Sequence, residues 1–180
     1  MMSSRFTIHM VASLDGFIAK KGGSIDWLQS NDSFENGLVL TEQDIETFLG
    51  NIDCYIMGSK TYEHALKLDW PYGDKPIIVV TSRKLKKEKG SVDFYYGSLE
   101  QLVGNLKQHY QNIWIVGGAM LTKAFLRLKL ADDIVISFMP ILLGDGLHFF
   151  DYVGQEQPLH LKDIKAYKDG MVELWYEIRK

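Results

Sequence analysis

The sequence has one cysteine, Cys54, among its 180 residues, so an intramolecular disulfide is impossible. A zinc site built from paired cysteines is excluded for the same reason, and a reducing compartment is the natural setting. The longest apolar run, residues 134–143, contains Ser137 and Pro140 and falls well short of the roughly 20 residues that span a bilayer. The N-terminus lacks the layout of a signal peptide. We therefore expect a cytoplasmic protein with no membrane partner.

An excess of basic charge is also missing. The 20 lysines and arginines are outnumbered by 23 aspartates and glutamates, which gives a net charge of −3 and no reason to expect nucleic acid as a partner. The one basic run, residues 83–89, is typical of a solvated stretch. The 46% hydrophobic content is ordinary for a globular protein, and no repeat or linker interrupts the chain. We expect one domain over residues 1–180.

Apolar, strand-like runs alternate with helix-like segments through the first three quarters of the chain. The expected strands are residues 6–12, 52–57, 77–82, 92–96, 113–116 and 134–140. Helices are expected after Thr41 and Ser98, which suit an N-cap, and after Gly118, running to about Leu130. The last part differs, because residues 159–165 and 172–177 alternate apolar and polar side chains around an Asp-Gly turn. This order predicts an α/β fold: a mixed, mostly parallel sheet flanked by helices, ending in an antiparallel hairpin.

Three of the expected strands end in small or hydroxyl residues. These ends are Met57-Gly58-Ser59-Lys60-Thr61, Val80-Thr81-Ser82-Arg83 and Val116-Gly117-Gly118-Ala119. Taken alone, the two adjacent glycines indicate either a tight strand-to-helix turn or a phosphate loop. If the three strands are neighbours, their carboxyl ends form one cradle for a ligand with several phosphates. Neither the Rossmann glycine pattern nor a P-loop is present.

Four segments in this order resemble the dihydrofolate-reductase-like superfamily. They are Ser13-Leu14-Asp15-Gly16-Phe17-Ile18-Ala19, residues 57–63, residues 116–119 and residues 140–146. More specifically, they resemble the reductase domain of bifunctional riboflavin-biosynthesis enzymes and its stand-alone bacterial relatives. The deaminase half of those enzymes needs a zinc site with two cysteines, which this chain cannot supply. The resemblance implies a three-layer fold and an NADPH-dependent reductase with no metal.

The resemblance also assigns cofactor roles along the chain. The nicotinamide site is matched by Val11, Ala12 and Ile18, and the segment at the pyrophosphate and adenosine ribose by Gly58, Ser59, Lys60 and Thr61. The strand end near the adenosine 2′-phosphate is matched by Thr81, Ser82 and Arg83. The pyrophosphate loop is matched by Val116, Gly117, Gly118, Ala119, Met120 and Leu121. In dihydrofolate reductases the two glycines are joined by a cis peptide bond.

The sequence departs from the family pattern at Ser59, where dihydrofolate reductases usually carry an arginine that grips the 2′-phosphate. Preference for NADPH over NADH then depends on Lys60 and Arg83, with Lys84 as a further candidate, and lysine does not reproduce a bidentate arginine contact. The substrate carboxylate is matched best by Asp44, with Glu42 as another possibility; Asp44 also suits a capping box.

Asp15, the second candidate for a catalytic residue, is equally suited to a turn before Gly16. Three functions stay open, all compatible with a small-molecule substrate: a riboflavin-type reductase, a true dihydrofolate reductase, and a nucleotide-binding protein without turnover. Hydride transfer needs few side chains, so the substrate cannot be inferred from catalytic residues. The riboflavin-type relatives dimerise, and the alternating C-terminal hairpin offers an edge to cover, so we expect a homodimer.

Overall fold

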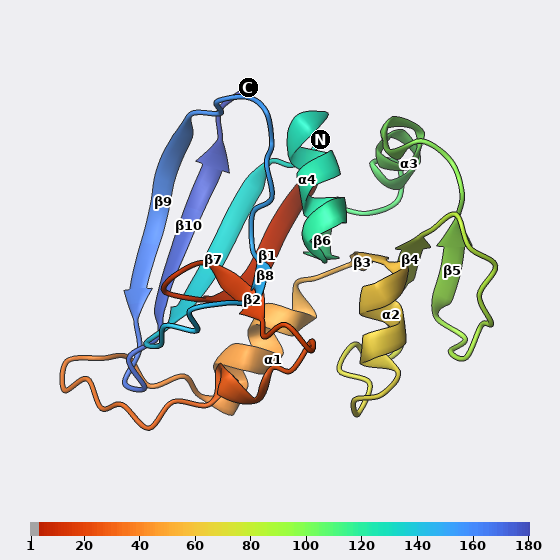
Figure 1. Ribbon diagram of the computed structural model, residues 1–180. Coiled ribbons are helices and arrows are strands. Elements are labelled where there is room, and N and C mark those ends of the chain that lie inside the picture. The colour runs from red at the N-terminus through yellow and green to blue at the C-terminus, as the bar shows by residue number, and fades with distance from the viewer. Residues whose placement is uncertain (1–3) are drawn as a thin grey trace.

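A sheet of eight strands forms the centre of the computed structural model, which describes residues 4–180 (Figure 1). The strands are β1 (Arg5–Ser13), β3 (Cys54–Gly58), β4 (Ile77–Val80), β5 (Val92–Tyr95), β6 (Asn112–Gly117), β7 (Asp133–Met139), β9 (Leu159–Ala166) and β10 (Val172–Ile178). Their order is β5-β4-β3-β6-β1-β7-β10-β9. All pairs from β5 to β7 are parallel, and β10 pairs antiparallel with both β7 and β9. The predicted mixed sheet and C-terminal hairpin are confirmed.

The helices are η1 (Asp26–Leu28), α1 (Glu42–Gly50), α2 (Ser59–Ala65), α3 (Leu99–Leu106) and α4 (Ala119–Arg127). Thr41 and Ser98 cap α1 and α3 through their hydroxyls, as expected. The expectation that α4 reaches Leu130 was wrong. The helix ends at Arg127 because Lys129 adopts a left-handed conformation, with φ of 54°, and the chain turns there so that Leu130 N–H donates to the Phe125 carbonyl.

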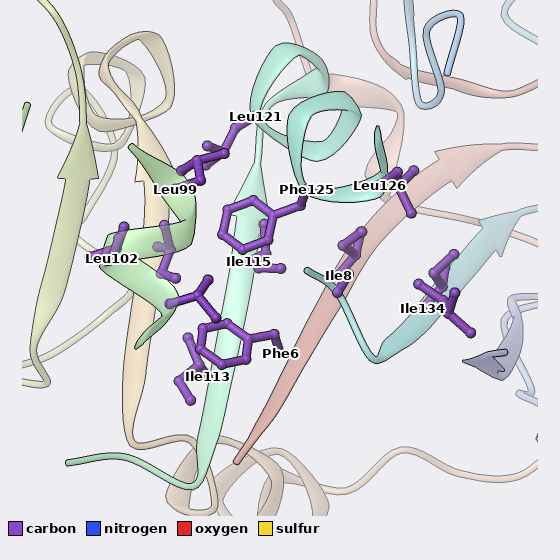
Figure 2. Close-up of a cluster of buried hydrophobic side chains, with 14 of the residues drawn as sticks. Phe6, Ile8, Leu99, Leu102, Ile113, Ile115, Leu121, Phe125, Leu126 and Ile134 are labelled. Atoms are coloured by element: carbon purple, nitrogen blue, oxygen red, sulfur yellow. The ribbon is translucent and has the colours of Figure 1, made fainter. Parts of the chain in front are cut away.

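The core divides between the two faces of the sheet. On one face, Phe6 and Ile115 pack against Phe125 of α4 and Leu102 of α3 (Figure 2). On the other face, Tyr62 of α2 lies in a second cluster of buried side chains: Ile52, Tyr55, Met57, Ile77, Val79 and Val92. Burying one such side chain contributes about 1.5–3 kcal/mol. Because helices cover both faces, the inner parallel strands β3 and β4 are apolar throughout, as buried parallel strands usually are.

A second, two-stranded sheet lies at the carboxyl end of β1. It pairs β2 (Phe17–Ala19) with β8 (Leu147–His148), and the Phe17 and His148 rings stack with centroids 4.6 Å apart. Gly146 must be glycine, because a Cβ there would lie 2.2 Å from the carbonyl oxygen of Ala19. The small sheet therefore joins the loop after β1 to the loop after β7. The sequence did not predict this pairing.

Helix α1 covers the sheet only loosely. None of its nine described residues is buried, and the side chains of Ile45 and Phe48 are 43% and 42% exposed. The Phe48 ring still contacts the sheet, with its centroid 5.1 Å from that of His9 and 5.5 Å from that of Trp114. Across residues 4–180, no helix combines the length and the apolar character needed to cross a membrane.

Candidate functional site

The three strand ends singled out in the sequence, those of β3, β4 and β6, lie side by side. Strand β3 is the middle strand and pairs in parallel with both β4 and β6. In the register of these pairs, Gly58 is opposite Val80, and Met57 is opposite Gly117. Since parallel strands end at the same edge of a sheet, the residues that follow them meet there. The condition for a shared cradle is met.

Two helices begin inside this cradle. Helix α2 starts directly after Gly58 and α4 directly after Gly118, and neither of these N-cap glycines supplies a side-chain cap. The first backbone N–H groups of α4 are therefore available to an anion, which the helix dipole also favours. A Cβ placed on Gly118 would lie 3.6 Å from Oγ1 of Thr61, so the two helix starts face each other. We call this edge, formed by Gly58–Thr61, Gly117–Leu121 and Thr81–Arg83, the cradle.

The Gly117–Gly118 peptide bond is cis, as the resemblance to dihydrofolate reductases implies. Gly117 has a φ of +101°, and a Cβ at this position would lie 3.0 Å from the methyl carbon of Met10. The left-handed backbone conformation therefore calls for glycine here, with the flexible Met10 side chain of β1 close beside it. In the first turn of α4, Leu121 is buried against the sheet core, whereas the Met120 side chain is 75% exposed.

The residues matched to the nicotinamide site lie on β1 and β2. Ala12 is fully buried near the carboxyl end of β1, and Val11 is half-buried beside it. Ile18 of β2 is half-buried and packs against the same core. Met10 of β1 contacts Gly117, and Ala12 lies on the same face of the sheet as Met10. Val11 points to the opposite face, because successive side chains alternate along a strand.

The basic part of the cradle is built from α2 and the segment after β4. Thr81 Oγ1 accepts a hydrogen bond of 3.0 Å from the Arg83 N–H, and Arg83 Nη2 lies 2.7 Å from Oε2 of Glu63. The hydrogen bond from Arg83 holds the pKa of Glu63 below its usual range. Lys60 and Ser82 are exposed.

Tyr62 of α2 anchors the second half of the basic run, residues 83–89. Its hydroxyl donates to the Lys86 carbonyl and accepts from the Glu88 N–H, both at 3.1 Å. The lysines of the run are exposed, as expected, yet the backbone that carries them is anchored.

Asp15 is a turn residue by its contacts. Its carboxylate accepts hydrogen bonds from the Ser13 hydroxyl at 2.6 Å, the Leu143 N–H at 3.1 Å and the Gly144 N–H at 2.7 Å. The bond from Ser13, followed by those from Gly144 and Leu143, lowers the pKa of Asp15. The side chain thus joins the loop after β1 to the turn after β7, and it stays ionised.

Asp44 completes the capping box of α1. Its Oδ2 accepts from the Thr41 hydroxyl at 2.6 Å and from the Thr41 N–H at 2.9 Å, and these bonds lower its pKa. Asp44 and Glu42 are both exposed. Within residues 4–180, neither Asp44 nor Asp15 makes a hydrogen bond or ion pair with a cradle residue.

A third carboxylate, Glu173 of β10, was not singled out by the sequence. In the sheet register it lies opposite Ser137, which in turn lies opposite Val11, so the three side chains share one face and one row. The Glu173 side chain is 20% exposed, and its contacts are long: 3.4 Å to Ser137 Oγ, 3.6 Å to Lys165 Nζ and 3.9 Å to His9 Nε2. A mostly buried carboxylate without a short hydrogen bond is open to a further partner. The alternation of polar and apolar residues in the hairpin predicts that Glu173 faces solvent. The available signal to the contrary was Ser137, a polar residue within an otherwise apolar strand.

His9 lies beside this row and is neutral. Its ring stacks on Trp114 with centroids 4.9 Å apart, and burial lowers the pKa of His9 to about 4. The 3.9 Å contact with Glu173 is therefore not an ion pair at neutral pH.

Two of the hollows on the described surface lie at opposite ends of the strands. The larger, about 610 Å³, lies at the amino ends of β3 and β6, between Ile52, Asp53 and Asn112, and is far from the cradle along the strands. The smaller, about 220 Å³, lies at the carboxyl end of β7 and is lined by Trp27, Gln29, Ser30, Asn31, Asp32, Met139, Pro140 and Ile141. Position favours the smaller hollow as part of the site, since ligands of such sheets bind at the carboxyl ends of strands. Residues 4–180 hold no cluster of three metal-ligating side chains.

Comparison with known proteins agrees with this architecture. Protein YwjB of Bacillus subtilis (strain 168), described as uncharacterized, is 34% identical over 178 residues, which cover 97% of this chain and 98% of YwjB. The crystal structure of a putative riboflavin biosynthesis protein from Shewanella sp. PV-4 is similar with a TM-score of 0.83 and 25% identity, covering 98% of this chain and 99% of that one.

Dihydrofolate reductase from Enterococcus faecalis, solved with NADP(H), shares the fold with a TM-score of 0.62 at 16% identity, covering 98% of this chain and 97% of that one. The fold is therefore dihydrofolate-reductase-like. The RibD C-terminal domain family matches residues 5–172. The chain belongs to the RibD C-terminal domain family.

Proposed function

We propose that the protein is a reductase that transfers a hydride from NADPH to a small heterocyclic or pyrimidine/pterin-like substrate, and that it resembles the riboflavin-pathway reductases of the 5-amino-6-(5-phosphoribosylamino)uracil type. The observation that carries the proposal is the cradle, in which three adjacent strand ends bring Gly58, Thr61, Arg83 and Gly118 together in a chain of this family. The dihydrofolate reductase of the same fold, solved with NADP(H), adds support.

The cradle fits a dinucleotide by its own chemistry. The space in front of Gly118 is free of a side chain up to the Thr61 hydroxyl, so a pyrophosphate can approach the first N–H groups of α4. Thr61 can donate to the same oxygens, and Val11, on the face that carries Glu173, offers apolar contact that keeps water from the nicotinamide. When bound, the cofactor supplies the hydride, and the chain supplies orientation.

On the substrate side we assign the leading role to Glu173. Its row continues from Val11 through Ser137, so a heterocycle lying against the nicotinamide comes within reach of this carboxylate. Glu173 can accept a hydrogen bond from a ring N–H and keep the ring oriented or protonated during transfer. Asp44 is the alternative from α1, but its Oδ2 is held by Thr41.

The test combines binding and turnover. NADPH and NADH are titrated against tryptophan fluorescence, and reduced-nicotinamide absorbance is then followed with the aminouracil ribosyl phosphate or with dihydrofolate. Turnover of the former supports the proposal, turnover of dihydrofolate supports a true dihydrofolate reductase, and binding without turnover indicates a nucleotide-binding protein. The variant Thr61→Val, which keeps the shape and removes the hydroxyl, should weaken NADPH binding by about tenfold. Absence of saturable binding of either cofactor overturns the proposal.

We also propose that the protein forms a homodimer through the C-terminal hairpin. Strand β9 is an edge strand, and its Leu159, Leu161 and Ile164 side chains are 44%, 42% and 55% exposed. An edge that exposes apolar residues is commonly covered by a second chain. Light scattering should give a dimer mass for the wild type and a monomer mass for Ile164→Lys; a monomeric wild type contradicts the proposal.

A further inference from the structure

The ion pair between Glu63 and Arg83 lies at the outer end of the cradle. Glu63 belongs to the second turn of α2, and Arg83 follows β4 closely, so the pair connects two of the elements that form the site. Oε2 of Glu63 and Nη2 of Arg83 are 2.7 Å apart, and the side chains are 42% and 50% exposed. Both charged groups are therefore accessible to a ligand that enters the cradle.

Glu63 is an anion within a group of cations. Lys60 and Lys67 of the same helical region act on it together with Arg83, and all three favour its charged form. The contact with Glu63 is the one side-chain ion pair that Arg83 makes within residues 4–180. Glu63 thus partly neutralises the positive charge that the sequence assigned to recognition of the 2′-phosphate.

The two partners are suited to opposite forms of the cofactor. A guanidinium binds the 2′-phosphate of NADPH, whereas a carboxylate accepts a hydrogen bond from the free ribose 2′-hydroxyl of NADH. In this chain the two groups lie next to each other and are already paired. Either cofactor can therefore find a complementary group.

We propose that the Glu63–Arg83 pair makes the cradle accept both NADPH and NADH, and that Glu63 is the residue that limits the preference for NADPH. This inference rests on the proposed function, since it concerns the same cofactor site. A 2′-phosphate takes Arg83 away from Glu63, which is possible because an exposed ion pair is weak. The carboxylate then remains close to the phosphate and repels it. With NADH the pair stays intact.

The test compares dissociation constants of NADPH and NADH for four proteins. For the wild type we expect the two constants to differ by less than about tenfold. Glu63→Gln should bind NADPH about fivefold more tightly, because the repulsion between the carboxylate and the 2′-phosphate is lost. It should bind NADH about twofold more weakly, because the charged acceptor for the ribose 2′-hydroxyl is lost. Arg83→Gln should weaken NADPH by about tenfold and leave NADH within about twofold.

Glu88→Gln is the matched control. Glu88 lies in the same basic segment, pairs with Lys86 at 2.9 Å, and carries the same charge change without touching Arg83. Its effect on the NADPH to NADH ratio should be under about twofold. Thermal unfolding of each variant shows whether it is folded.

Three results overturn the inference: a wild-type preference for NADPH of about a hundredfold or more, a Glu63→Gln ratio equal to that of the wild type, or an equal shift in Glu88→Gln. If both cofactors bind and only the ratio fails to respond, the pair has no such role and the proposed function stands. If neither cofactor binds to the wild-type protein, the proposed function fails as well.

Discussion

The Asp15 carboxylate accepts a hydrogen bond of 2.7 Å from the backbone N–H of Gly144, across 129 residues of sequence. We expect Asp15→Asn to loosen both loops, because an amide presents an N–H where the native oxygen accepts one. The melting temperature should fall, and NADPH should still bind. A variant with unchanged melting temperature and no turnover would instead assign Asp15 a catalytic role.

His9 makes stability depend on pH. The unfolded residue takes up its proton near pH 6.5, whereas the folded residue has a pKa of about 4 because it is buried. Its contribution is therefore complete above pH 6.5 and is lost as the pH falls to about 4, with a total of about 3 kcal/mol. Urea unfolding across this range should show the decline. In His9→Gln the slope between these two pH values should be clearly smaller, and an equal slope would contradict the assignment.

Asp133 holds Arg5 through two hydrogen bonds, 2.8 Å from Nε to Oδ2 and 2.6 Å from Nη2 to Oδ1. The bond to Asp133 raises the pKa of Arg5, and the Asp133 side chain is only 2% exposed. Asp133→Asn should lower the free energy of unfolding by about 2 kcal/mol, because the Arg5 guanidinium then faces a neutral amide in place of a carboxylate. Urea unfolding measures this. Glu177→Gln, which changes the more exposed partner of Arg5, should cost less; equal losses would show that burial of Asp133 is unimportant.

Glu173 and Asp44 can be separated by a pair of matched variants. If Glu173 orients the substrate, Glu173→Gln should lower kcat at least tenfold for the best acceptor and leave the NADPH dissociation constant within about twofold. Asp44→Asn should mainly weaken the cap of α1 and leave kcat nearly unchanged. A large loss of kcat in Asp44→Asn with little loss in Glu173→Gln would instead assign the orientation of the substrate to Asp44. Steady-state kinetics over a range of pH is the measurement.

The sequence predicted what depends on short stretches of chain. The caps at Thr41 and Ser98 and the turn at Asp169-Gly170 are local signals, and each appears where expected. The cradle was predicted only on the condition that its three strands are neighbours, and the strand order, which is a long-range property, meets that condition.

What was missed depends on contacts between distant segments. Strand β8 has two residues, too few for any periodic pattern, and exists only because β2 lies beside it. Glu173 looked like one polar residue of an alternating strand, and only its register with Ser137 places it on the face that continues from Val11. Likewise, the apolar face that Ile45 and Phe48 give to α1 does not by itself lead to burial, because contacts with the sheet decide how closely the helix is covered.

The pairing of β2 with β8 couples the lengths of two turns that are far apart in the sequence. Side chains alternate along β2, so one residue inserted between Ser13 and Phe17 would turn Phe17, now 8% exposed, outward and Ile18 inward. The same insertion would move the Asp15 carboxylate away from the backbone N–H groups of Leu143 and Gly144, from which it accepts hydrogen bonds. Insertions in either turn are therefore tolerated only when the other changes with it, and homologous chains should vary the two lengths together.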